Sequence, residues 1–393
     1  MKFSKLVQPG LDKGVKHTGM MSEDPTLIKF SIGNPPPEGF AVERIRAISD
    51  RLIAEEPNSL LNYGSAGGRD DFRDAIRAFM NRRVKVINDE DIITVTSGGQ
   101  QGISFAIQAF CDPGDVILCE DPTFMAALDM FRNLGAKPVG VKMNDDGIDL
   151  EDLEKKMQMQ PKPKLLYIIP DFQNPMGVSL PEWKRKEVCR LAYEYDVPVL
   201  EDNPYYELRY DGEFIPLLKH YDEHGMVGLV SSMSKIVGPG MRCGFVAAPG
   251  SFGQAIANLK YSADLHTTTW AQRVSCELLT HDMEKDLEGL RKLYEHRGHK
   301  MQECLAEYCH PDVHFTHPQG GMFIWVTMPE GTDMDAFLKE LDDNRVVVVP
   351  GKRFFTDGTY QTPSFRLSYS LATDEEIEKG IRILGDLTKK YCK

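Results

Sequence analysis

Apolar and polar positions follow two different periods along the middle of the chain. Short apolar runs predict buried strands at residues 92–96, 116–119, 165–169, 197–200 and 228–230. Segments with apolar residues three or four positions apart predict helices at residues 100–110, 123–133 and 182–195. Strands that alternate with helices predict an α/β fold with a mostly parallel central sheet and helices on both faces. Ligands in such sheets bind outside the carboxyl ends of the strands.

The pattern changes on both sides of this region. Before it, residues 1–40 are irregular and end in a run of three prolines that cannot continue a helix, and a helix follows at residues 69–83. After residue 285, the pattern predicts strands at 322–326, 346–349 and 365–369 and helices at 283–307, at 334–341 and from Asp374. We therefore expect an arm at 1–45 that reaches the small domain and the pocket mouth, a large domain at 46–285 and a small α+β domain at 286–393.

The charge and cysteine content of the chain indicate which classes of partner and compartment to expect. The chain has 393 residues, a formal net charge of −13 and a pI of about 5.3. An acidic protein of this kind is not expected to bind nucleic acid, because phosphate contacts need clustered basic side chains. The first seven residues contain no long apolar segment typical of a signal peptide, and the eight cysteines include no Cys-x-x-Cys pair, so a cytoplasmic enzyme with reduced thiols is expected.

Lys235 is the first candidate for chemistry, because it follows a predicted buried strand. Ser232 and Ser234 precede it, and Arg242 follows seven residues later, so hydroxyl and guanidinium donors for a phosphate lie near the lysine in sequence. A lysine at the end of a strand is also often simply solvated. As a nucleophile that forms a Schiff base, it would need a desolvated, cation-rich pocket that favours its neutral form.

A glycine-rich turn between a predicted strand and helix is the second candidate. Ser97, Gly98 and Gly99 would direct backbone amides and the positive end of a helix dipole toward an anion. A plain tight β–α turn explains the same residues equally well. The segment lacks the Gly-Lys-[Ser/Thr] ending of a P-loop, and the glycines at 238–244 do not match the dinucleotide fingerprint, so neither a nucleoside triphosphate nor a dinucleotide is favoured.

Polar side chains follow two further predicted strands. Asn174 comes after the strand at 165–169, and Asp202 and Tyr205 come after the strand at 197–200. Each alone is as well explained by a turn or a helix cap. At one edge of one sheet, however, a carboxylate, an amide and a phenol suit a pyridine cofactor, whose ring nitrogen needs an acidic partner.

Taken in order, these motifs resemble those of the class I and II aminotransferases, a family of fold type I pyridoxal-phosphate enzymes, and in particular the branch with 2-aminoadipate-type aminotransferases. The resemblance extends from Gly33 to Arg366. It implies that Lys235 holds pyridoxal phosphate and moves the substrate proton, that Asp202 pairs with the ring nitrogen, and that Asn174 and Tyr205 contact the ring oxygen. It also implies a phosphate site formed by Ser97, Gly98, Gly99, Ser232, Ser234 and Arg242.

The resemblance assigns four further positions. Phe124 occupies the place of an aromatic residue that stacks on the ring, although it lacks the hydroxyl of the tyrosine usual there. Tyr63 resembles a tyrosine that reaches the phosphate in the partner subunit, which implies a homodimer with shared sites. Arg366 matches the arginine that holds the substrate α-carboxylate, with Gly33 and Asn174 also expected at the substrate. From alternation alone, Arg366 fits an ordinary surface salt bridge as well as a pocket.

The expected activity is therefore transfer of an amino group between an L-amino acid and a 2-oxo acid by a ping-pong mechanism. A carbon–sulfur β-lyase or an aminocyclopropane-forming enzyme would use the same residues and stays open. A cofactor-sensing regulatory module is disfavoured because residues 1–60 are too irregular for a winged helix. No metal is expected, since the histidines at 310, 314 and 317 do not share one helix face. Arg44 and Arg46 are candidates to meet an acidic substrate side chain.

Overall fold

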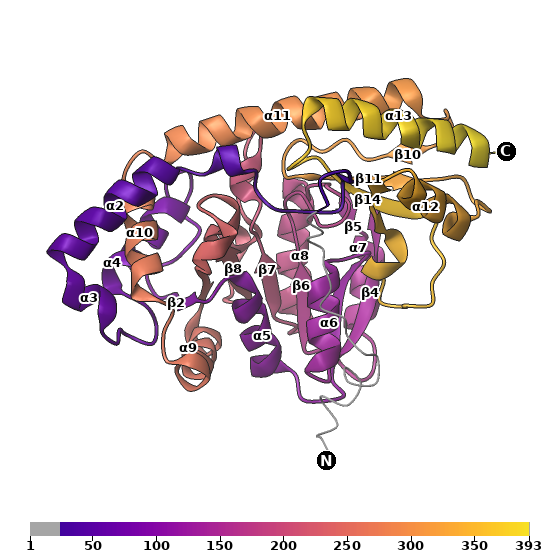
Figure 1. Ribbon diagram of the computed structural model, residues 1–393. Coiled ribbons are helices and arrows are strands. Elements are labelled where there is room, and N and C mark those ends of the chain that lie inside the picture. The colour runs from indigo at the N-terminus through magenta and orange to yellow at the C-terminus, as the bar shows by residue number, and fades with distance from the viewer. Residues whose placement is uncertain (1–23, 393) are drawn as a thin grey trace, which may run out of the picture.

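The computed structural model describes residues 24–392, which form a large central sheet flanked by helices and a smaller layer at one side (Figure 1). The central sheet has eight strands in the order β2-β9-β8-β7-β6-β3-β4-β5. Their bounds are β2 (Ile92–Thr96), β3 (Val116–Asp121), β4 (Lys137–Asn144), β5 (Gly147–Ile148), β6 (Leu165–Ile168), β7 (Val199–Asp202), β8 (Val227–Ser232) and β9 (Gly244–Ala248).

The sheet is mostly parallel at its centre, as the alternation predicted. Strands β8, β7, β6, β3 and β4 pair in parallel, while β9 runs antiparallel to both of its neighbours and β5 runs antiparallel to β4. Five neighbouring strands therefore end at one edge of the sheet, where the segments that follow β6, β7 and β8 come together.

Helices cover both faces of this sheet, and the side chains of β3 show why. Val116 and Leu118 pack with residues of α7 (Leu150–Met157) and α8 (Glu182–Glu194). Ile117 and Cys119 point to the other face and pack with residues of α5 (Gly99–Phe110) and α6 (Met125–Asn133). A strand buried on both faces is an apolar run without polar alternation, which is the pattern that the sequence shows.

The remaining helices lie at the two sides. α2 (Val42–Glu55), α3 (Pro57–Leu61), α4 (Asp70–Met80), α9 (Gly250–Asp264) and α10 (Thr269–Thr280) surround the β2 end of the sheet (Figure 1). The long α11 (Met283–Tyr308) and α13 (Asp374–Tyr391) lie side by side across the top of the molecule in this view. α12 (Met334–Asp343) packs against α13.

Beneath α11 and α13 lies a second, four-stranded antiparallel sheet. Its order is β10-β11-β14-β13, with bounds His314–Phe315, Phe323–Thr327, Ser364–Ser368 and Val349–Pro350. The single strand predicted at residues 346–349 is wrong in detail: β12 (Val346–Val347) pairs with β1 (Ile28–Lys29), whereas β13 joins β14. Residues 346–350 thus contribute one short strand to each of two sheets.

The pairing of β1 with β12 fixes the start of the described chain beside the small sheet. Ser368 N donates to Phe30 O at 2.7 Å, so residues 30–34 run along β14 toward the large sheet. The predicted arm at residues 1–45 lies partly outside the described residues, and the division of the chain at residues 45 and 285 stays a prediction. In the described part of the chain, no helix is long and apolar enough to cross a membrane.

Candidate active site

A cavity of about 680 Å³ opens at the carboxyl ends of β6, β7 and β8. Its wall comes from segments far apart in sequence, including residues 31–34, the start of α5, the start of α6 and the small sheet. Most of the residues singled out in the sequence line it: Gly33, Gly99, Phe124, Asn174, Asp202, Tyr205, Ser232, Ser234, Lys235, Arg242 and Arg366.

Lys235 lies in a short 3-10 turn directly after β8. The Ser232 hydroxyl caps this turn by accepting a hydrogen bond from the Ser234 amide at 3.1 Å. Lys235 Nζ donates to the backbone oxygen of Gly33 at 2.7 Å. Burial, followed by the nearby charges of Arg366 and Arg242, lowers the pKa of Lys235 to about 8. At pH 7 about one tenth of the amine is therefore neutral, far more than for an ordinary lysine, and the neutral form is the one that acts as a nucleophile or base.

Asp202 is the last residue of β7 and lies buried in the wall of the cavity. Burial raises the pKa of its carboxyl group to about 7, against the lowering effect of a hydrogen bond from Tyr167. Tyr167 Oη donates to Asp202 Oδ2 at 2.6 Å. Among residues 24–392, no side chain donates to the other oxygen, Oδ1. That free acceptor suits a protonated ring nitrogen, whose charge would favour the ionised carboxylate.

Arg366 lies in β14 and is 3% exposed. Its Nη1 donates to Asn174 Oδ1 at 2.8 Å, and its Nη2 donates to Ser31 O at 2.9 Å. The guanidinium carbon lies 4.1 Å from the ring centroid of Phe323. Its Nε is buried and has no partner among the described residues. Burial lowers the pKa of Arg366 to about 10, so the side chain is still charged near neutral pH. Because its guanidinium is incompletely paired, it can bind an anion in the cavity.

The predicted phosphate site is only partly assembled around Arg242. Its Nη2 donates to Ser97 O at 3.1 Å. Gly98 has a φ of 85° and lies so close to this guanidinium that a Cβ there would collide with it, so the position requires glycine. Gly99 begins α5 and lines the cavity. The Ser97 hydroxyl lies 3.0 Å from Asp264 Oδ2, to which it donates, and Ser97 and Gly98 are not among the lining residues.

Three other predicted positions have distinct surroundings. Tyr205 is buried in the cavity wall, and burial raises the pKa of its phenol above the usual range. Phe124 lines the cavity as the residue before α6. Tyr63 lies outside it: its side chain is 86% exposed, and its ring meets that of His266 edge to face at 6.0 Å between centroids.

The structure also brings to this site residues that the sequence did not single out. Tyr167 contacts Asp202 as described, and Glu120 on β3 is fully enclosed nearby, with its pKa raised to about 8 by burial. Arg353 lines the cavity, whereas Arg44 pairs with Asp286 and Arg46 faces Asp50, so neither predicted arginine reaches the cavity wall. Clustering of titratable groups with raised or lowered pKa values in one cleft is typical of a functional site.

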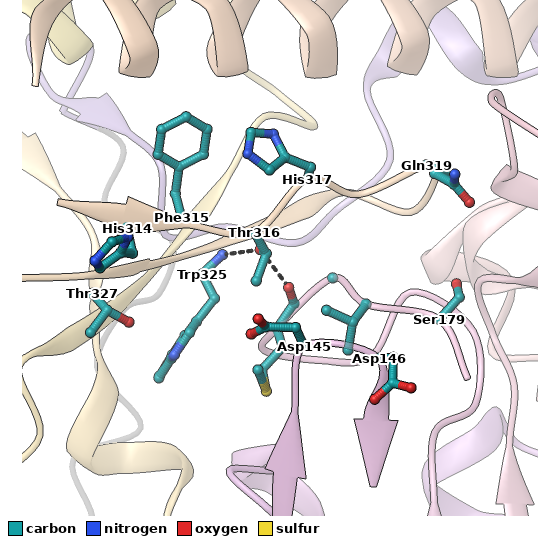
Figure 2. A pocket seen from close by; sticks show the side chains of 13 residues that line it. Asp145, Asp146, Ser179, His314, Phe315, Thr316, His317, Gln319, Trp325 and Thr327 are labelled. Carbon is teal, nitrogen blue, oxygen red and sulfur yellow. Dashed lines mark hydrogen bonds between the residues drawn. The ribbon is translucent and has the colours of Figure 1, made fainter. Parts of the chain in front are cut away.

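A second cavity, of about 740 Å³, lies between the small sheet and the turn that joins β4 to β5 (Figure 2). Thr316 Oγ1 donates to Met176 O at 2.7 Å and accepts from Trp325 N at 3.0 Å. Figure 2 shows Phe315 and His317 on the opposite side of the strand from Trp325. None of the predicted site residues lines this cavity, and we place the chemistry in the first one.

Metal ligands do not converge in the described structure. Across residues 24–392, no three side chains of histidine, cysteine, aspartate or glutamate are arranged to hold a metal ion. His317 Nδ1 lies 3.0 Å from Gln302 Oε1, and His310 lies beside Asp312, so these histidines have other neighbours.

Comparisons with known proteins match nearly the whole chain. The model of the family described as aminotransferase class I and II matches residues 25–384. Aromatic-amino-acid aminotransferase 1 of Thermococcus litoralis is 35% identical over 377 residues, which cover 94% of this chain and 90% of that protein. The crystal structure of a multiple substrate aminotransferase from Thermococcus profundus superposes with a TM-score of 0.90 at 32% identity, covering 100% of this chain and 96% of that one.

A further solved structure carries a cofactor derivative. Alpha-aminoadipate aminotransferase from Thermus thermophilus, complexed with N-(5'-phosphopyridoxyl)-L-leucine, has a TM-score of 0.87 at 30% identity, and the match covers 93% of each chain.

Proposed function

Because this chain belongs to the aminotransferase class I and II family, and is therefore a pyridoxal-phosphate-dependent aminotransferase, we propose that it moves an amino group from an L-amino acid to a 2-oxo acid in two half-reactions at the cavity around Lys235. The observation that carries this assignment of the site is the convergence of Lys235, Asp202 and Arg366 on one cavity. Each of them has its pKa moved by burial toward neutrality.

The residues present fit the cofactor. Asp202 would pair with the pyridine nitrogen through the oxygen that Tyr167 leaves free, and Tyr205 and Asn174 would contact the ring oxygen. Arg242, Ser232, Ser234 and the amide of Gly99 would hold the phosphate, with the charge of Arg242 supplying the strongest contact. Phe124 would stack on the ring. Ser97 and Gly98 would act through backbone groups beside Arg242.

Bound pyridoxal phosphate supplies a carbonyl carbon that accepts the amino group and an electron-poor ring that stabilises negative charge at the substrate Cα. The protein supplies proton transfer and orientation. Lys235, neutral in part because its pKa is about 8, would take the proton from the substrate Cα as general base and would then hold that proton on Nζ as the general acid that returns it. Asp202 keeps the ring nitrogen protonated.

Arg366 would hold the substrate α-carboxylate. Its guanidinium is already oriented by Asn174 and by the backbone of Ser31, so little side-chain entropy is lost on binding. Gly33 lies beside Lys235 and forms the adjacent wall. Because amino acids and 2-oxo acids share an α-carboxylate, one arginine serves both half-reactions.

The working unit that we propose is a cytoplasmic homodimer. Leu61 and Tyr63 are 88% and 86% exposed, and apolar side chains so open to solvent are common at subunit contacts. From such a contact, Tyr63 would reach the phosphate of the partner subunit. All eight cysteines are free, as expected for a reducing compartment.

A screen of half-reactions tests this function. The purified holoenzyme is mixed with each of the twenty amino acids without an acceptor, and the visible absorbance of the bound cofactor is followed. Loss of the absorbance with release of a stoichiometric 2-oxo acid, and its recovery on adding a 2-oxo acid, is the expected result. Continuous production of pyruvate and ammonia without an acceptor would instead indicate a β-lyase.

A further inference from the structure

We propose that Arg353 forms a second carboxylate-binding site in the catalytic cavity and selects substrates with a distal carboxylate, namely dicarboxylic amino acids and 2-oxo acids. The inference rests on the proposed function, because it takes Arg366 as the holder of the α-carboxylate. Arg353 was not singled out in the sequence, and the predicted candidates Arg44 and Arg46 do not line the cavity.

The charges of the cavity support this assignment. Four cationic side chains line it, Lys235, Arg242, Arg353 and Arg366, against two anionic ones, Asp129 and Asp202. In the proposed complex the cofactor phosphate faces Arg242, the ring nitrogen faces Asp202 and the α-carboxylate faces Arg366. Arg353 then remains without an assigned anion.

The guanidinium of Arg353 is free to accept a ligand. Across residues 24–392, no hydrogen bond or ion pair to a protein group involves it, and its side chain lies at the exposed edge of the cavity. Asp129, which also lines the cavity, forms an ion pair with Arg132, whose Nη1 lies 3.8 Å from Asp129 Oδ1. The positive charge of Arg353 also lowers the pKa of Arg366, so the two arginines act on one another and a bound dianion would relieve that repulsion.

The backbone that carries Arg353 is held firmly on both sides. Gly351 packs against the backbone of Ser364 so closely that a Cβ would collide with it. Phe354 is fully buried, its ring lies 5.2 Å from the guanidinium carbon of Arg366, and its carbonyl accepts from Thr123 N at 2.8 Å. The side chain of Arg353 therefore extends from a fixed base beside the ring that packs on Arg366.

A planar guanidinium matches a carboxylate with two parallel hydrogen bonds. Arg366 and Arg353 together would thus recognise a substrate with a carboxylate at each end. A donor of the same length with an amide in place of the distal carboxylate would lose the charge-assisted contact. Selection for dicarboxylates should therefore show in the comparison of L-glutamate with L-glutamine.

The test compares single-turnover half-reactions of the holoenzyme with L-glutamate, L-2-aminoadipate, L-glutamine and L-norleucine. Arg353→Gln should lower kcat/KM for the two dicarboxylic donors at least about tenfold, and change it for the two neutral donors less than about twofold. Lys352→Gln is the matched control, because Lys352 is the adjacent cation, does not line the cavity and faces Asp335 at 3.5 Å. It should leave all four rates unchanged.

A second measurement needs no variant. Glutarate should inhibit the wild-type enzyme competitively at a concentration at least about tenfold lower than butyrate, and added salt should weaken this difference. Equal inhibition by both acids, or an equal loss for charged and neutral donors in Arg353→Gln, would overturn the proposal. If no amino acid discharges the cofactor absorbance of the wild type, the proposed function itself fails, which is a separate outcome.

Discussion

The hydrogen bond from Tyr167 to Asp202 should control how readily the enzyme accepts its cofactor near neutral pH. Both side chains are buried, and Tyr167 Oη lies 2.6 Å from Asp202 Oδ2. Hydrogen bonds to charged groups contribute about 1.5–3 kcal/mol, and one pKa unit corresponds to about 1.36 kcal/mol. Tyr167→Phe should therefore raise the pKa of Asp202 from about 7 by roughly one to two units.

The expected effect on cofactor binding follows from the ionised fraction. At pH 7 about half of the wild-type Asp202 is ionised, whereas the variant would retain roughly one part in ten to one part in a hundred. If the carboxylate form is the one that binds, the apparent Kd for pyridoxal phosphate rises roughly fivefold to fiftyfold. Above about pH 9.5 the carboxyl is ionised in both proteins, and the difference should nearly disappear.

The assay is a titration of apoenzyme with pyridoxal phosphate between pH 6 and pH 10, followed by visible absorbance. The ratio of variant to wild-type Kd is used, because the titrations of the cofactor and of Lys235 then largely cancel. Tyr294→Phe is a suitable control, since Tyr294 is fully buried and its hydroxyl has no partner among the described residues. A ratio that stays constant with pH would refute the reasoning and leave Tyr167 a packing role.

Three further predictions concern the substrate-binding residue Arg366, the buried carboxyl group of Glu120 and the proposed subunit contact at Tyr63. Arg366→Lys should raise the KM of donor and acceptor together, by roughly tenfold or more, without changing the cofactor spectrum. The reason is that an ammonium group cannot form the two parallel hydrogen bonds that a planar guanidinium makes to a carboxylate. An effect on one substrate alone would contradict a binding site shared by both α-carboxylates. Glu120, whose pKa burial raises to about 8, contributes stability that is present below its usual pKa and is lost as pH rises through about 8. Glu120→Gln should therefore flatten the fall in apoenzyme Tm between pH 5 and pH 8, and an unchanged slope would show that Glu120 is not the responsible group. Mixing Lys235→Ala subunits with Tyr63→Phe subunits should restore part of the activity, because one site in each mixed dimer then carries neither lesion, and no recovery after proven exchange would place Tyr63 in its own subunit's site.

The central strands could be predicted because their apolar runs are continuous. β3 and β6 are buried on both faces, so each is close to an uninterrupted run of apolar residues. β4 was missed since it is largely half-exposed and contains Pro138, and β9 was missed because its first residue, Gly244, was considered only for the dinucleotide fingerprint. The helices α9 and α10 have small or polar residues at many positions, which weakens the helical period.

The candidate site could be predicted where polar residues stand at strand ends. Lys235 and Asn174 follow buried strands and Asp202 ends one, and parallel strands bring their carboxyl ends to one edge. Tyr167 was missed because an aromatic residue inside a buried strand looks like core. Arg353 was missed because nothing in a charged loop sequence indicates which side chain will face a cavity, and that depends on how Phe354 and Gly351 pack.

The most direct test of the account is to locate the covalent attachment of the cofactor. The purified protein should be yellow, and borohydride reduction followed by proteolysis and mass spectrometry should place the pyridoxyl group on Lys235. Lys260 is the useful internal comparison, because it is also buried but is held by Asp264 and Thr267 and does not line the cavity. A pyridoxyl group on Lys235 alone is the predicted result, and one on Lys260 or any other lysine would contradict the assignment of the site.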